Sequence, residues 1–409
     1  MALTTVSSDR LSTNVKNTNF TAAEKQDLTD DILPLATQFG QSKNLIINGA
    51  MQVAQRGTTN TNEGYRTVDR FRNAFNGTDE APTQEQADVV AGTTPYTLGF
   101  RKSYKITNGN QTGGAGATDY VGFEHHIEAQ NVATSGWNFN SASAKITLSF
   151  WIKSSVAQAF SGSVEAPDTT TNKFFKFTTA SLSADTWTKV TLQIIGDSNL
   201  TVNNDNGAGL VVRLYGFIGT TYTSSDSDTE TWVSGSNRYA NDMTSTWYTT
   251  NDATLEITGV QLEVGSVATD FEHLSFADDL RKCQRYYYTA WKGSGNGDFV
   301  TGSDTQTACE VGSYSSSEIY FVPIFPVLMR DAPTLKQANV SGGLTVHRSA
   351  GTVTIDQGGW NAIIQAGKQA ARVYCQTGSN RLSGNVSSGE PYPLKMTAAG
   401  VYMAFDAEL

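Results

Sequence analysis

Few residues in this chain combine the types and the spacing that chemistry requires. There are four histidines, and two of them lie in the sequence EHHIE at Glu124–Glu128. On a β-strand Glu124, His126 and Glu128 share one face, and three such side chains could hold a zinc ion. Their side chains would point in parallel, however, and no second histidine falls on that face. We therefore favour a half-exposed strand and predict no metal and no cofactor.

Common catalytic patterns are also missing from the sequence. It contains no GxSxG, HExxH or P-loop pattern, and no GxGxxG pattern after a strand. A glycan-cleaving enzyme would need two carboxylates facing a sugar bond, and nothing in the sequence singles out such a pair. We predict that the protein is not an enzyme and has no catalytic residue.

Aromatic residues offer a different kind of chemistry. The polar segment 220–253 shows little alternation and carries several rings, namely Tyr222, Trp232, Tyr239, Trp247 and Tyr248. A long segment of this kind inside a compact domain is usually functional or disordered. Rings among Ser, Asn and Asp suit carbohydrate binding, because a ring packs on the C–H face of a pyranose while amides and carboxylates bond its hydroxyls. A trimer contact, or a loop packed on its own domain, fits the same residues. As ligand-binding residues we select Trp232, Tyr239 and Trp247.

The composition limits the range of partners. The chain has 409 residues, of which 38% are hydrophobic and 17% charged, and its formal net charge is −10. An acidic chain without a Lys/Arg run is a poor ligand for phosphate backbones or anionic membranes. No run of about 18 apolar residues occurs, so we predict no membrane insertion. The three cysteines are far apart and form no CxxC, which indicates buried free thiols in a protein made in a reducing cytoplasm.

The elements that must position these residues are mainly β-strands. The segment KITLSFWIKS at Lys145–Ser154 alternates cleanly, WTKVTLQII at Trp187–Ile195 does the same, and GLVVRLYGFIG at Gly209–Gly219 is apolar on both faces, as in a central strand. Polar turn clusters separate these strands, which indicates a two-sheet sandwich. Short strands with glycine-rich loops resume after residue 286, and Pro323 and Pro326 there are expected to mark an edge strand or bulge. No internal repeat of fixed period appears, which counts against a β-helix or propeller.

The segment Ile257–Tyr287 connects the two β-rich parts. Apolar residues fall at odd positions up to Ile257 and at even positions from Val260, so a β-bulge is predicted near Thr258–Gly259. A helix should then open at Ser275, with Asp278 three residues later in a capping-box pattern.

The N-terminal residues 1–43 differ from the rest of the chain. Thr21 with Glu24 forms a capping box, which predicts a short helix from Ala22 to about Leu33, and Pro34 should end it. An isolated helix this short is marginal in water and needs a partner. We interpret residues 1–43 as an assembly or attachment arm; an N-terminus docked on its own core is the alternative.

Several motifs in combination resemble one family. ITGVQLEVGSVATDFEH with LRKCQRYY, NLIINGAMQVAQRG, YRTVDRF, FPVLMRDAPTL and the final DAEL resemble segments of bacteriophage tail-fibre and virion structural proteins. The resemblance covers most of residues 44–409, and its motifs are typical of packing and turns, not of catalysis. It implies that the first sandwich is a jelly roll like those of carbohydrate-binding modules.

The predicted fold is therefore mainly β, in four parts. They are an N-terminal arm with a short helix (1–43), a jelly-roll β-sandwich (44–275), a linking helix (276–285) and a second, smaller C-terminal β-sandwich (286–409). The resemblance implies a virion protein, assembled in the host cytoplasm, that forms a homotrimer and meets other virion proteins through the arm. It also implies a tail fibre or receptor-binding protein that recognises host surface glycan; the alternative is a structural or decoration protein of the tail or capsid.

The resemblance also places recognition in the C-terminal sandwich, because such fibres generally attach through their N-terminal end. Three aromatic residues there lie near glycine-rich loops and are predicted to be exposed ligand-binding rings, namely Trp291, Trp360 and Tyr374. Tyr374 lies inside the alternating run ARVYC, so a place in the core is an equal alternative for its ring.

Overall fold

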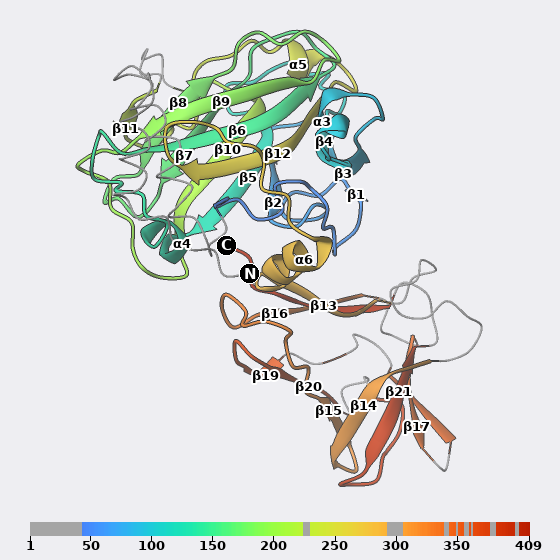
Figure 1. The fold of residues 1–409 in the computed structure, drawn as a ribbon. Helices are drawn as coiled ribbons and strands as arrows, with labels where there is room; N and C mark the ends of the chain where they lie inside the picture. The colour runs from blue at the N-terminus through green and yellow to red at the C-terminus, as the bar shows by residue number, and fades with distance from the viewer. Residues whose placement is uncertain are drawn as a thin grey trace. The chain divides into compact units, whose positions relative to one another are not determined.

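The computed structural model describes residues 43–223, 230–292, 306–338, 343–348, 351–355, 360, 363–376, 382–396 and 401–409. The predicted arm helix at 22–33 lies outside these residues. The chain divides into two compact units, Met1–Asn44 and Leu45–Leu409, and the second is described below. Element labels follow Figure 1.

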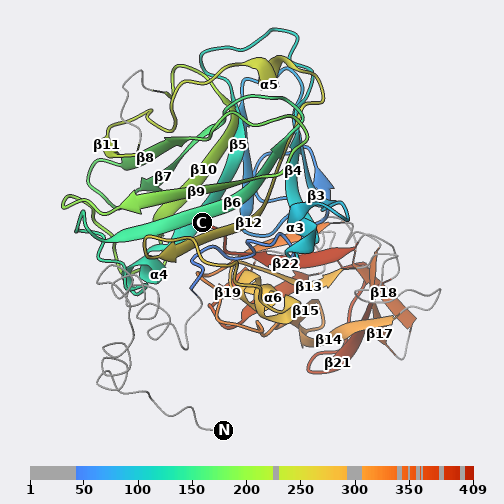
Figure 2. The ribbon, with the colours of Figure 1, turned by 45° about the horizontal axis from the view of Figure 1, so that its top comes forward.

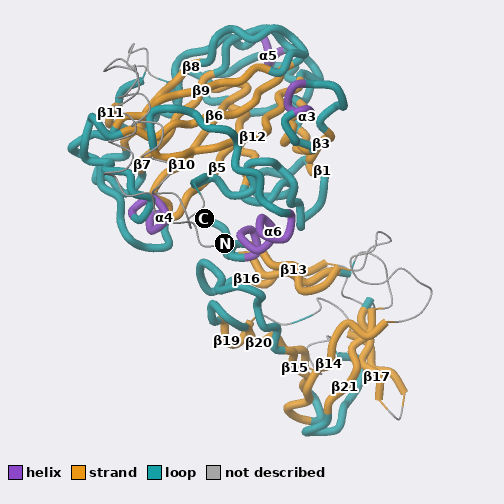
Figure 3. Tube along the Cα trace, viewed as in Figure 1, coloured by secondary structure: helices purple, strands orange, loops and turns teal. Residues whose placement is uncertain are grey.

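The protein is mainly β, as predicted, and its first part is a sandwich of two antiparallel six-stranded sheets (Figures 1, 2 and 3). In spatial order, the strands of one sheet are β1 (Thr59–Asn60), β3 (Thr83–Asp88), β4 (Lys102–Thr107), β12 (Thr254–Val264), β6 (Lys145–Ser154) and β9 (Thr188–Ile195). The strands of the other are β11 (Trp232–Ser234), β8 (Lys173–Thr178), β7 (Ser161–Ala166), β10 (Ala208–Ile218), β5 (Tyr120–Glu128) and β2 (Phe71–Asn76).

The segments with alternating apolar residues form strands of the sandwich. Ile146, Leu148 and Ile152 of β6 are fully buried, because one face of this strand lies between the two sheets. The strand β10 is apolar on both faces and lies between β5 and β7, which confirms its predicted central place. The periodicity of the sequence thus identified β6 and β10, two strands of this core.

The predicted bulge is present in β12. Its pairing with β6 shifts register between Thr258 and Gln261, so Ile257 and Leu262 both face the core despite their odd and even positions. Gly259 takes a positive φ of 62°, and a Cβ there would lie 2.6 Å from the ring of Phe100. Glycine is required at this position for the kink and for the close approach of that ring.

The C-terminal part contains two further antiparallel sheets. A three-stranded sheet consists of β13 (Tyr287–Lys292), β22 (Tyr402–Asp406) and β16 (Thr334–Ala338). A seven-stranded sheet consists of β18 (Gly351–Ile355), β17 (Leu344–Arg348), β21 (Pro391–Met396), β14 (Gln306–Ser315), β15 (Glu318–Phe321), β20 (Ala371–Gln376) and β19 (Ile363–Ala366). Side chains from both sheets share one hydrophobic core. The domain boundaries drawn from the sequence stay predictions.

Four short helices complete the described structure: α3 (Thr94–Thr97), α4 (Ala129–Ala133), α5 (Thr246–Thr249) and α6 (Phe276–Gln284). The helix α6 is the predicted linking helix. The Ser275 hydroxyl accepts from the amide of Asp278 and donates to its carboxylate at 2.6 Å, which confirms the expected cap. None of the helices in the described ranges has the length and apolar character needed to cross a membrane.

Two smaller predictions can also be compared with the structure. Cys283 and Cys375 are buried free thiols, as expected, whereas the side chain of Cys309 lies outside the described set. The segment around Pro323 and Pro326 was predicted to be an edge strand or bulge, but it follows β15 as irregular backbone with an isolated bridge from Ile324. Prolines lack the amide needed for a regular ladder.

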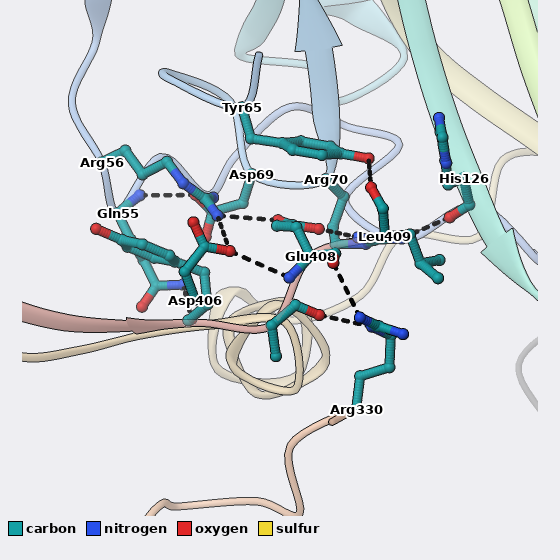
Figure 4. Close-up of polar contacts among 12 residues, drawn as sticks. Gln55, Arg56, Tyr65, Asp69, Arg70, His126, Arg330, Asp406, Glu408 and Leu409 are labelled. Atoms are coloured by element: carbon teal, nitrogen blue, oxygen red, sulfur yellow. Dashed lines mark hydrogen bonds and ion pairs between the residues drawn. The ribbon is translucent and has the colours of Figure 1, made fainter. Parts of the chain in front are cut away.

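The motifs that carry the family resemblance converge on one buried polar network, which we call the junction (Figure 4). The Arg70 guanidinium is fully buried, pairs with the carboxylate of Glu408 and lies 3.4 Å from the ring centroid of Tyr286. Arg56 pairs with Glu408 at 3.1 Å and with Asp69 at 3.4 Å. Residues from four of the motifs therefore meet in one network of ion pairs and a cation–π contact.

A further arginine holds the last residues of the chain in the junction (Figure 4). Arg330, from the FPVLMR segment, donates to the carbonyl oxygens of Ala407 and Glu408 at 2.6 and 3.0 Å. It also donates to the carbonyl of Asn206, in the loop before β10, at 3.0 Å. This segment is thus a structural clamp, in agreement with its interpretation as a packing motif.

The junction predicts a large stability effect for Glu408→Gln. Removing the charge of Glu408 leaves Arg70 buried without its carboxylate, so the free energy of unfolding should fall by about 3–5 kcal/mol. Chemical denaturation at pH 7 measures it. The control is Asp88→Asn, which breaks the exposed pair with Lys102 and should cost less than about 1 kcal/mol. Equal effects of the two substitutions would contradict a stabilising role for the junction.

Candidate functional site: a groove at one end of the sandwich

A groove of about 600 Å³ opens where loops meet at one end of the first sandwich. Three segments line it: residues 115–117 before β5, residues 217–220 at the end of β10, and residues 242–246 leading into α5. We call it the loop-end groove. Its volume lies in the usual range for small-molecule sites, roughly 300–1,000 Å³.

The lining combines hydroxyls and a carboxylate with an apolar floor. Phe217 and Ile218 are nearly buried, whereas Asp242 and the hydroxyl-bearing residues Thr220, Thr244 and Thr246 are exposed. Hydroxyls and a carboxylate can donate to and accept from a polyhydroxylated ligand, while the floor can cover C–H groups. The groove can therefore offer hydrogen bonds and an apolar contact to the same ligand.

The backbone of the groove is fixed by close contacts. Gly219 donates to the carbonyl of Asp119 at 2.7 Å, and Thr221 donates to the carbonyl of Ala117 at 2.9 Å. A Cβ at Gly219 would lie 2.4 Å from the carbonyl oxygen of Ala117, so any larger residue would push these two walls apart.

Trp247 anchors the third wall and is not a ligand-binding ring, which corrects the prediction. Its side chain is fully buried, and its indole N–H donates to the carbonyl of Thr254 at 3.0 Å. The ring packs on Gly216 of β10, where a Cβ would lie 2.6 Å from it. Tyr248 beside it is also buried, with its ring 4.7 Å from that of Phe217 beneath the groove. The segment has little alternation because it is held by a few large rings instead of a strand ladder.

Tyr222 and Tyr239 gather beside the groove with Tyr120 and Tyr215 from the strands. The rings of Tyr222 and Tyr120 meet edge to face at 5.4 Å, and Tyr222 lies 6.2 Å from Tyr239. All of them belong to a cluster that includes the groove residues Ile218 and Met243. Tyr222 and Tyr239 are half-buried, so they support the groove more than they present an open stacking face.

Trp232 lies in β11 at the edge of the sheet, where its ring packs on Phe175 at 5.6 Å. Its indole N–H donates to the carbonyl of Ile195 at 2.6 Å, so the polar end of the side chain is used within the fold. The ring is half-buried, and its role as a ligand-binding ring stays a prediction.

The outer face of the second sheet carries a row of charges beneath residues 230–245. Arg72, Glu124 and Arg213 are adjacent across β2, β5 and β10, and Arg213 also pairs with Glu165. Burial opposes ionisation of Glu124, but its bond to His126 and the charges of Arg213 and Arg72 outweigh it and hold its pKa well below the usual range. The Arg213 guanidinium lies 5.2 Å from the Tyr239 ring, so Tyr239 covers this part of the face.

EHHIE lies in β5, which is almost fully buried and not the half-exposed strand that was predicted, because partners on both of its faces cover it. Glu128 forms a two-pronged pair with Arg285 after α6, at 2.7 Å to each of its oxygens. His126 contacts Glu124 at 3.4 Å. In the part of the chain that the structure describes, no group of three His, Cys, Asp or Glu side chains is arranged to hold a metal ion.

Of the three aromatic residues selected in the C-terminal part, Trp360 does not have the predicted surroundings. Trp360 is 1% exposed and lies in the core, so the predicted exposed ring is wrong. The side-chain amide of Gln337 donates to the backbone carbonyl of Trp360 at 2.9 Å and accepts from its backbone N–H at 3.0 Å. Trp291 lies within β13 opposite Met403, and its side chain lies outside the described set. Tyr374 is half-buried on the outer face of β20, opposite Tyr320.

Sequence reasoning missed the groove residues. Thr220, Asp242 and Thr244 come from a segment that was singled out for its rings alone, and residues 115–117 were interpreted as an ordinary turn. The one signal in the sequence was the concentration of Ser, Thr and Asp around Met243. Any polar loop has a similar composition, so this signal does not distinguish a groove from an ordinary loop.

Comparisons with known proteins give similarity at the level of solved structures alone. No protein-family model and no curated protein sequence matches the chain. A putative sugar-binding protein from Bacteroides thetaiotaomicron is 13% identical with a TM-score of 0.30, over 54% of this chain and 99% of its own. A family 16 carbohydrate-binding module is 11% identical with a TM-score of 0.26, over 54% and 99%.

The enzymatically active domain of tailspike protein 4 from bacteriophage CBA120 is also similar. It is 10% identical with a TM-score of 0.27, over 54% of this chain. This chain covers 21% of that chain's length. Identities and TM-scores this low do not indicate a ligand or an activity for this chain.

The burial of Trp360 predicts that Trp360→Ala acts on stability. Emptying its site in the core should lower the free energy of unfolding by about 3–5 kcal/mol, which thermal or urea denaturation measures. Tyr374→Ala, which removes a half-exposed ring from the same part of the chain, is the matched control and should cost clearly less. A folded Trp360→Ala protein of unchanged stability would place that ring outside the core.

Proposed function

We propose that the chain is a non-enzymatic bacteriophage virion protein of the tail-fibre or receptor-binding type that recognises host surface glycan. The observation that carries the glycan part is the loop-end groove, with its exposed hydroxyls and carboxylate above an apolar floor. The virion part rests on the motif resemblance. Its residues meet in the junction, as expected of motifs that serve packing.

The chemistry of the groove supports binding without cleavage. Glycoside hydrolysis by the usual route needs two carboxylates on either side of the scissile bond. Among the described residues that line the groove there is one, Asp242, and it accepts a hydrogen bond from Thr223. A single carboxylate tied to its own loop fits recognition of hydroxyls.

The junction also favours a second candidate, a structural or decoration protein of the tail or capsid that binds no receptor. The residues that carry the resemblance lie in the junction and not in the groove, so the resemblance supports a virion role more than a ligand. Images of the intact particle separate the two: projecting fibres favour recognition, and a flat position on the shell favours decoration.

Glycan binding predicts a loss of affinity when the groove is filled. Ala115→Trp places a large ring at an exposed lining position, and Asp242→Ala removes the carboxylate. Each should weaken binding to host envelope glycan about tenfold or more, measured by calorimetric titration. The matched control is Ala184→Trp at an exposed position outside the groove lining. The wild type should release no oligosaccharide. Release abolished by a single Asp or Glu substitution, or full affinity in both groove variants, would contradict the proposal.

Assembly is a further part of the proposal. We expect a homotrimer that meets other virion proteins through residues 1–43, and a particle location reached after assembly in the host cytoplasm. Closed symmetry gives each arm the same environment. Light scattering at micromolar concentration should give three times the chain mass of 44.0 kDa. A monomer at that concentration would contradict this expectation.

A further inference from the structure

Exposed apolar side chains are concentrated in one stretch of the C-terminal part. Eight large hydrophobic residues are strongly exposed among those the structure describes, and four of them lie between residues 314 and 328: Tyr314, Val322, Ile324 and Leu328. Tyr314 is 68% exposed. A large exposed apolar ring on a strand is available to meet a ligand or partner.

Strand register places Tyr314 next to further rings and polar groups. Tyr320 of β15 lies opposite Tyr374 of β20, and Glu318 lies opposite Gln376. These residues alternate with Ile319, Val373 and Cys375, which are fully buried, so they occupy the outer face of the seven-stranded sheet. Tyr314, Tyr320, Tyr374, Glu318, Arg372 and Gln376 form what we call the tyrosine platform.

Arg372 fixes two of the rings. Its guanidinium carbon lies 4.9 Å from the ring centroid of Tyr320 and 5.4 Å from that of Tyr314, which is within the range of a cation–π contact. Gly312 lies opposite Tyr320, and a Cβ there would come within 2.7 Å of that ring. The ring of Tyr320 therefore packs over Gly312, which has no side chain, and Arg372 contacts both Tyr320 and the exposed Tyr314.

The polar groups of the platform are also held in place. Arg372 contacts Glu318 at 3.3 Å, and the amide of Gln376 donates to Glu318 at 2.7 Å. The positive and negative charges match, so the platform presents donors and acceptors without a net charge of its own. Side chains already fixed in the unbound protein lose little conformational freedom on binding.

We propose that the tyrosine platform is a second carbohydrate site, with a neutral pyranose stacked on Tyr314. The ring would cover the C–H face of the sugar, while Arg372, Glu318 and Gln376 bond its hydroxyls. Balanced charge and interleaved polar groups fit a neutral sugar better than the apolar centre of a protein interface. The inference rests on the proposed glycan recognition and adds a site outside the loop-end groove.

The test uses the full chain and an array of bacterial envelope oligosaccharides, followed by titration of any sugar that binds. Tyr314→Ala should weaken binding roughly tenfold or more, and Tyr314→Phe should retain most of it because the stacking ring remains. Phe276→Ala removes an exposed ring of α6, outside the platform, and should change nothing. The same titrations in the Ala115→Trp background isolate the platform from the groove.

Each outcome decides between the two sites. If Tyr314→Ala binds the sugar like the wild type, the platform is not a sugar site, whatever the groove variants do. If it leaves sugar binding unchanged but lowers the mass measured by light scattering, the platform contacts a second copy of the chain and the inference is wrong. If Ala115→Trp and Asp242→Ala have no effect while Tyr314→Ala does, the groove assignment fails and the platform stands.

Discussion

The pairing of a buried charge is the constraint on which the described fold depends most. The side chain of Arg70 is removed from water altogether, and an unpaired ion in that position would cost several kcal/mol. The fold meets this cost with the carboxylate of Glu408, the ring of Tyr286 and the carbonyl of His126. These groups come from distant parts of the sequence, so the pair can form only when the chain from β2 to the last strand is in place.

The same need to pair charges shapes the outer face of the second sheet around Arg213. Arg213 and its carboxylate partners lie across its strands, and residues 230–245 cover them with Tyr239. Aromatic rings in this segment that were candidates for carbohydrate binding instead cover these charges or pack in the core. The loop-end groove lies instead at the end of the sandwich, between backbone turns and short polar side chains.

Much of the fold followed from the sequence. The change from odd to even apolar positions in β12 located the bulge, and Ser275 with Asp278 located the start of α6. These signals are local, because a strand or a helix cap is set by residues within a few positions of each other. The motif interpretation was also right in kind, since Arg56, Arg330 and Glu408 serve packing. Their meeting in a single network required contacts between residues up to 352 positions apart.

The sequence by itself determined which side chains share a strand face, and the tertiary structure decided which of those faces is covered. Trp247 and Trp360 lie in polar or glycine-rich surroundings and were expected on the surface, yet both rings fill the core because neighbouring elements close over them. Tyr314 lies in a strand that the sequence did not single out, and it is exposed because its side chain lies outside the hydrophobic core that buries Ile319 and Val373. Periodicity fixes direction relative to the backbone, whereas burial depends on what the rest of the chain brings to that side.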